Sequence, residues 1–93
     1  MNKDILKEKL REIFIKVDPM GIYFPEDKNI DEYDKEIDLL IQWLDTSYTQ
    51  QDLLEKIWQL FKIRFGNFEA GAKEKYEQLT NSVWKIIRED NSN

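Results

Sequence analysis

Residues 33–44 read YDKEIDLLIQWL, and this stretch decides the fold. Its apolar side chains recur at the i, i+4, i+7, i+8 and i+11 spacing, which places them along one face of an α-helix. They are Tyr33, Ile37, Leu40, Ile41 and Leu44. The spacing predicts an amphipathic helix over about residues 31–45 that buries this face against the rest of the chain.

The segment before it repeats the pattern. Residues 3–17 carry an equal stripe, made of Leu6, Leu10, Ile13, Phe14 and Val17. This predicts a helix that either Asn2 or Asp4 caps and that ends at Asp18-Pro19, because proline disfavours a helical residue before it. Its basic side chains alternate with acidic ones, which indicates salt bridges within the helix. The loop that follows, residues 18–30, is rich in large apolar side chains, so we expect it to pack onto the core.

Two further helices are predicted in the second half. Thr49 and Asp52 have the spacing of a capping box that opens a third helix, and Gly66 is suited to close it. Asn67 can cap a fourth helix over about residues 68–89. Four helices with short connections predict an all-α fold, a small antiparallel bundle in which residues 1–93 form a single domain.

Composition excludes several classes of function. The chain has 14 basic and 19 acidic residues, a formal net charge of −5, which argues against nucleic-acid and anionic-membrane binding. It has no Cys and no His, so thiol nucleophiles, histidine bases and the usual zinc sites are absent. Residues 27–38 match an EF-hand loop poorly, because Glu32 stands where the turn needs glycine. We expect no enzyme activity, no cofactor and no metal site.

Hydropathy gives an expectation about location. The longest uninterrupted apolar run is three residues, too short to span a bilayer, and the first residues do not form a secretory signal. We therefore expect a soluble protein of the cytoplasm.

The negative charge is concentrated in one segment. Residues 26–38 contain seven acidic and two basic side chains, which accounts for the whole net charge of −5. On the predicted second helix, four carboxylates form a ridge beside the apolar face: Asp31, Asp34, Asp38 and Asp45. Two interpretations remain open. The ridge is either a solvated face or a docking surface for a basic partner, whose association it would accelerate.

The aromatic residues divide between core and surface roles. Trp58 and Trp84 border apolar stripes and are predicted to lie in the core. Trp43 lies on the opposite flank of the second helix from the ridge, where it either packs under the 18–30 loop or anchors a partner. Tyr23 is a second candidate anchor.

Two motifs carry a resemblance. Asp18-Pro19-Met20-Gly21 and, after a spacer, Asp31-Glu32-Tyr33-Asp34 precede the amphipathic helix. This pattern resembles small bacterial helical proteins, many without an assigned function, some of which are immunity proteins of contact-dependent inhibition or related polymorphic toxin systems. The resemblance implies a compact helical fold and, as one possible role, neutralisation of a toxin.

The motif residues themselves are predicted to be structural. Asp18 is expected to cap a tight turn through its own downstream amides, with Pro19 and Gly21 shaping that turn. Tyr33 is then expected to pack against the turn, and Asp31 and Asp34 to cap the second helix.

Together these features predict an immunity protein that binds a cognate, co-encoded toxin domain, a basic nuclease, through its acidic surface. The alternative is a non-catalytic adaptor or self-associating helical protein of housekeeping type. Neither the toxin nor the oligomeric state, monomer or dimer, follows from the sequence.

Overall fold

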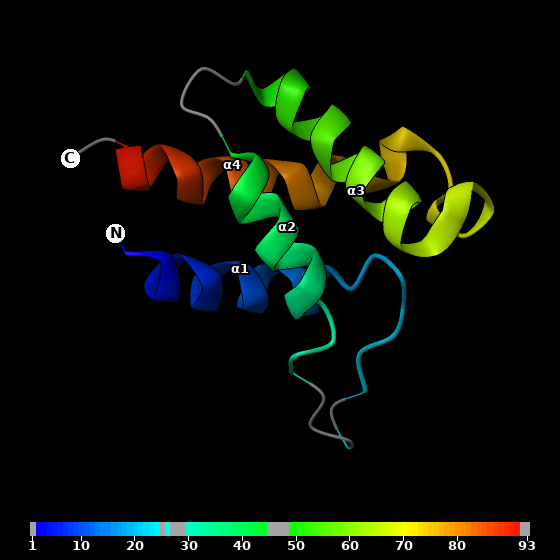
Figure 1. The fold of residues 1–93 in the computed structure, drawn as a ribbon. Coiled ribbons are helices and arrows are strands. Elements are labelled where there is room, and N and C mark those ends of the chain that lie inside the picture. Colours follow the sequence, from blue (N-terminus) through cyan, green and yellow to red (C-terminus); the bar gives the residue numbers. More distant parts are fainter. Residues whose placement is uncertain (1, 25, 27–29, 45–48, 92–93) are drawn as a thin grey trace.

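The computed structural model describes residues 2–24, 26, 30–44 and 49–91 of the 93-residue chain, residues 90 and 91 in their backbone only. The described residues include four α-helices and the 3-10 helix η2, and none of them is in a strand (Figure 1). The elements in chain order are α1 (Lys3–Val17), α2 (Asp34–Trp43), α3 (Gln50–Ala70), η2 (Lys73–Tyr76) and α4 (Glu77–Asn91). The prediction of a small all-α bundle is confirmed.

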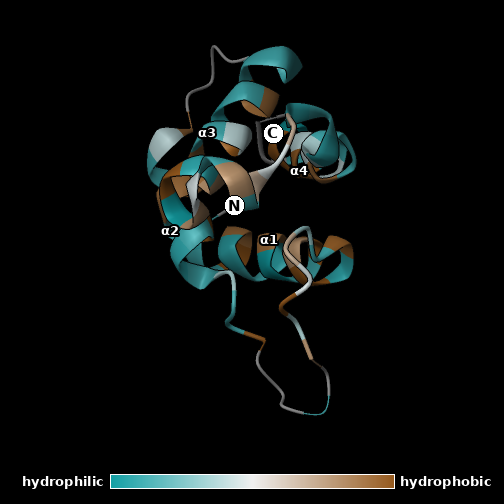
Figure 2. Ribbon diagram, turned by 90° about the vertical axis from the view of Figure 1, so that its right-hand side faces the viewer, coloured by the Kyte–Doolittle hydropathy of each residue, from teal (hydrophilic) through white to brown (hydrophobic). Residues whose placement is uncertain are grey.

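The four helices enclose a common interior. α1 packs against α2 and α4, and α3 packs against the same two helices, so α1 and α3 lie diagonally across the bundle. In Figure 1, α1 and α4 run in opposite directions, which brings the two ends of the chain to the same side of the molecule. Figure 2 shows that every helix carries both hydrophobic and hydrophilic residues, as amphipathic helices around one core must.

Aromatic rings fill the centre of the bundle. Phe61 of α3 lies 6.2 Å from Phe14 of α1, and 6.2 Å from Tyr33, between ring centroids. Its distance to Tyr76 of η2 is 4.9 Å. All four side chains are fully buried. Because these residues come from separate segments, their packing joins the diagonal helices that share no backbone contact.

The predicted starts of α1 and α3 are confirmed by their caps. The Asn2 side chain accepts a hydrogen bond from the Ile5 amide at 2.8 Å, which decides between the two candidate caps. At α3, Thr49 Oγ1 accepts from the Asp52 amide at 3.1 Å, and the Asp52 carboxylate accepts from the Thr49 amide at 3.0 Å. These reciprocal bonds form the expected capping box.

The end of α3 and the start of α4 differ from the prediction. Gly66 has the positive φ expected of it, +87°, and its non-helical backbone interrupts α3, but one more turn follows as far as Ala70. Gly71, with φ +77°, then ends it, and α4 starts at Glu77 after η2, instead of near residue 68. Two side chains fix this connection, because Tyr76 Oη donates to the Ala70 carbonyl at 2.5 Å and Trp58 Nε1 donates to the Gly71 carbonyl at 3.0 Å.

The loop after α1 packs down only in its first part. Met20 and Ile22 are partly buried against the core, as expected. Phe24 and Ile30 are 49% and 50% exposed, so the prediction is wrong for these two residues. In Figures 1 and 2 the described parts of this loop extend away from the bundle beside α1 and the start of α2. Residues 25 and 27–29 of the predicted loop lie outside the described residues.

Candidate functional site

Asp18 organises the approach to α2. Its carboxylate accepts hydrogen bonds from the amides of Ile22 at 3.0 Å and Tyr23 at 3.3 Å, and from Tyr33 Oη at 2.5 Å. Tyr33 Oη in turn accepts from the Met20 amide at 3.1 Å. Burial, followed by the hydrogen bond to Asp18, raises the pKa of Tyr33 well above its ordinary value. The predicted turn capping by Asp18 and the packing of Tyr33 against it are both confirmed.

The turn itself requires unusual backbone angles. Asp18 ends α1 in the left-handed region with φ +46°, and Gly21 follows with φ +64°. The Gly21 amide donates to the Asp18 carbonyl at 3.0 Å, which closes the turn around Pro19. These residues therefore hold the loop against the core, the structural role expected of them.

The start of α2 differs from the prediction. The helix begins at Asp34 instead of near residue 31, and its N-cap, Tyr33, makes no side-chain capping bond. The expected caps by Asp31 and Asp34 are therefore wrong. Asp31 contributes only its carbonyl, which accepts from the Asp34 amide at 3.1 Å.

Asp34 and Asp38 of the predicted ridge bind α1 instead. Arg11 Nε and Nη2 donate to the two oxygens of Asp34 at 2.9 and 2.7 Å. Lys7 Nζ lies 2.9 Å from Asp38 Oδ1. The hydrogen bond to Asp34 is the main cause of a raised Arg11 pKa. These basic side chains thus pair between helices, which corrects the expectation of salt bridges within α1 for Lys7 and Arg11.

The other predicted partner-binding residues are dispersed. Asp31 is exposed and forms no ion pair with any described residue. Asp45 lies outside the described residues. Tyr23 is partly buried in the capped turn. Trp43 lies beside α3, where Lys56 Nζ is 5.9 Å from its ring centroid, at the far end of α2 from the loop, so packing under the loop is wrong.

The two remaining tryptophans pack partly against the core, as expected. Trp58 and Trp84 are both partly buried, and each has a basic side chain near its ring. Lys62 Nζ lies 3.8 Å from the ring centroid of Trp58.

A buried carboxylate marks a site that the sequence interpretation missed. Glu36 is only 2% exposed, and its Oε1 accepts a hydrogen bond from Arg64 Nε of α3 at 3.0 Å. Its Oε2 has no hydrogen-bond partner among the described residues. Glu36 falls three residues after Tyr33 and four before Leu40, within the apolar helical spacing. This position was the available signal that one acid of α2 faces inward.

Glu36 lines a pocket at the junction of the loop, α2 and α3. The pocket has a volume of about 360 Å³. It is lined by Ile22, Asp31, Glu32, Lys35, Glu36, Arg64 and Phe65, and we refer to it as the acidic pocket. Three of its charged side chains are acidic and two are basic. Leaving a buried acceptor unpaired costs about 1–3 kcal/mol, and more when it is charged, so the pocket favours a hydrogen-bond donor with a positive charge.

Two features are absent from the described part of the chain. No three acidic side chains there are grouped to bind a metal ion. No helix there is long and apolar enough to cross a bilayer.

Comparisons with protein-family models, with curated proteins and with solved structures gave no match. The resemblance to immunity-type proteins therefore stays a prediction from the Asp18-to-Gly21 and Asp31-to-Asp34 motifs and the amphipathic helix that follows them.

Proposed function

We propose that this chain is a non-catalytic inhibitor of the immunity type, which acts in the cytoplasm by binding a basic toxin domain encoded beside it. One observation carries the proposal: the buried, half-paired carboxylate of Glu36 opens on a pocket whose rim presents the exposed acids Asp31 and Glu32. Such an arrangement offers a partner both long-range attraction and a specific point of attachment.

The docking surface differs in position from the ridge expected from the sequence. Asp34 and Asp38 form ion pairs with Arg11 and Lys7, which reduces the negative potential that they produce outside the molecule. Asp31 and Glu32 have no such counter-ion among the described residues. The rim of the acidic pocket therefore presents two exposed carboxylates that the described residues do not pair.

The proposed mechanism is occlusion. A nuclease holds its substrate phosphates with basic side chains, and one of these can enter the acidic pocket and donate to Glu36 Oε2. Asp31 and Glu32 then pair with neighbouring basic side chains of the nuclease. The bundle thereby covers the nuclease cleft in which the nucleic acid binds. The inhibitor itself transforms nothing.

The test is co-purification with the product of the neighbouring gene, followed by rescue of growth in cells that express that product. The double variant Asp31→Lys, Glu32→Lys is expected to slow association at least about ten-fold at low salt, since charge reversal acts mainly on the association rate. A matched control reverses the exposed acids Glu69 and Glu74, which lie outside the pocket. Equal association rates for both double variants would reject this surface, and failure of the wild type to rescue growth would reject the immunity role.

A different observation favours the alternative, a self-associating adaptor. Phe68 and Ile63 at the end of α3 are 92% and 66% exposed, which is unusual for large apolar side chains. If these side chains form a contact between copies, sedimentation of the wild type gives a dimer that Phe68→Ser dissociates. A monomer at all concentrations excludes this role.

A further inference from the structure

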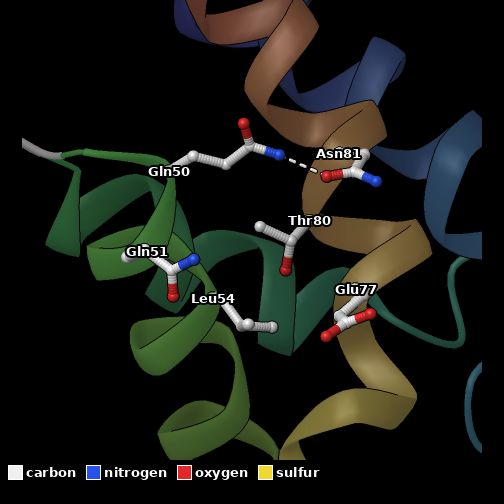
Figure 3. A pocket seen from close by; sticks show the side chains of 6 residues that line it. All are labelled: Gln50, Gln51, Leu54, Glu77, Thr80 and Asn81. Carbon is white, nitrogen blue, oxygen red and sulfur yellow. Dashed lines mark hydrogen bonds between the residues drawn. The ribbon is translucent and has the colours of Figure 1, made fainter.

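A second pocket lies on a different part of the bundle, between the first turn of α3 and the first turns of α4. Its volume is about 260 Å³. Figure 3 shows its lining residues, which are Gln50, Gln51, Leu54, Glu77, Thr80 and Asn81. None of them belongs to the acidic pocket, so a ligand here is independent of the function proposed above.

Thr80 gives this pocket its chemistry. The residue is only 2% exposed, and its Oγ1 has no hydrogen-bond partner among the described residues. In Figure 3 its hydroxyl points into the space between Leu54 and Glu77. A buried hydroxyl without a partner is destabilising by about 1–3 kcal/mol. A ligand atom that bonds to Thr80 removes this penalty and is therefore favoured.

The remaining lining residues restrict the kind of ligand. Glu77 is exposed, forms no ion pair with the described residues and is the one charged residue of the lining. Leu54 supplies an apolar wall. The Gln50 amide donates to Asn81 Oδ1 across one side of the pocket, and both of these side chains are exposed, which leaves them room to rearrange.

An anion is the wrong ligand for this pocket. The free amides at the start of α3 attract negative charge in general. Here the Asp52 carboxylate already accepts a hydrogen bond in the first turn of that helix, and Glu77 is the charged residue of the lining. The negative charge of Glu77 favours a cation.

We propose that the pocket binds a primary alkylammonium group. The ammonium donates to the Glu77 carboxylate and to Thr80 Oγ1, and its aliphatic stem lies against Leu54. Such a group belongs either to the lysine side chain of a protein or to a free aliphatic diamine. Both offer the same head and stem, so the chemistry of the pocket is common to them.

The test is a titration of the full-length ¹⁵N-labelled protein, followed by the side-chain amide signals of Gln50, Gln51 and Asn81. We expect n-butylammonium to shift these signals to saturation, whereas tetramethylammonium, which has the same charge and no N–H donor, shifts them little. Equal shifts with both cations, or shifts that never saturate, overturn the proposal and leave a hydrated polar pocket.

Variants locate the ligand. Glu77→Gln is expected to weaken binding about ten-fold or more, and Thr80→Val about five-fold, in line with the loss of a charged and a neutral hydrogen bond. Glu74→Gln removes the same charge from an exposed residue outside the lining and is the control. The proposal is wrong if Glu77→Gln and Glu74→Gln bind alike.

Thr80→Val also carries an internal check, because a valine fits the same space without the unpaired oxygen. The variant is therefore expected to unfold at an equal or higher urea concentration, so its loss of binding cannot be attributed to unfolding.

To separate the two sources of ligand, Nα-acetyl-lysine methylamide is compared with 1,4-diaminobutane. Tighter binding of the first assigns the site to a lysine side chain, and tighter binding of the second assigns it to a free diamine.

Discussion

Arg11 and Asp34, 23 positions apart in the chain, form a two-pronged ion pair that joins α1 to the first residue of α2. The guanidinium uses Nε and Nη2, so the two side chains lie in a fixed mutual orientation. The pair removes negative charge from the exterior and places it at the interface of two helices. The ion pair therefore contributes to the attachment of α1 to α2 as well as to the charge of the surface.

The ion pair is expected to stabilise the fold modestly. Its side chains are 27% and 22% exposed, and solvent screens such pairs. A double-mutant cycle with Arg11→Ala and Asp34→Ala in urea should give a coupling energy of about 1 kcal/mol. The pair Lys7 and Asp38, with Asp38 52% exposed, serves as the comparison. A smaller coupling for Arg11 and Asp34 than for this comparison pair would contradict the geometry.

Tyr33→Phe tests the tie between the loop and α2. The substitution removes the hydroxyl that donates to Asp18 and accepts from the Met20 amide. It is expected to lower the free energy of unfolding by about 1–3 kcal/mol, because both partners lose a bond in a partly buried site. Tyr23→Phe, in the same loop, is the control and should change stability little. Equal effects of the two substitutions on the free energy of unfolding would show that the hydrogen bonds of the Tyr33 hydroxyl do not stabilise the protein.

The raised pKa of Tyr33 predicts a loss of stability in alkali. Unfolding restores the ordinary value of 10.0, so above that pH the unfolded chain releases the Tyr33 proton while the folded chain retains it. The contribution of this group is thus fully present below pH 10 and declines as the pH rises further. Urea midpoints measured across this range should fall for the wild type more steeply than for Tyr33→Phe.

Glu36 is expected to show a conflict between stability and binding. Glu36→Leu removes a buried carboxylate with one unpaired oxygen and leaves Arg64, whose side chain is 36% exposed, to be solvated by water. Its free energy of unfolding should equal or exceed that of the wild type. Its affinity for a basic partner should fall.

The reciprocal substitution should behave differently. Arg64→Met leaves the buried Glu36 charge without its counter-ion, which is expected to destabilise the protein by about 3 kcal/mol. Urea unfolding of the two variants provides the comparison. If Arg64→Met lowers the free energy of unfolding less than Glu36→Leu does, the Glu36 carboxylate does not depend on Arg64 as its counter-ion.

Helical periodicity predicted the elements better than it predicted their connections. α1 was located because its stripe, its cap at Asn2 and its stop at Pro19 all agree. The start of α4 was misplaced because Tyr76 and Trp58 fix the backbone of residues 70 and 71 from a distance. Local propensity contains no information about such contacts.

The candidate site was likewise predicted only in part. The segment that carries the net charge was found by counting, but which acids remain available depends on neighbours from other helices. Arg11 and Lys7 cannot be assigned to α2 carboxylates until the crossing of α1 and α2 is known. Glu36 and Arg64 are 28 positions apart, and no spacing rule joins residues at that separation.

The bond from Tyr33 to Asp18 also defines what the chain is free to change. Asp18 and Tyr33 lie 15 positions apart, so the bond joins the two ends of the loop at its base. Because Phe24 and Ile30 are about half exposed, substitutions at these two positions are expected to leave the helices undisturbed. Changes at these two positions can therefore accumulate while the scaffold stays the same.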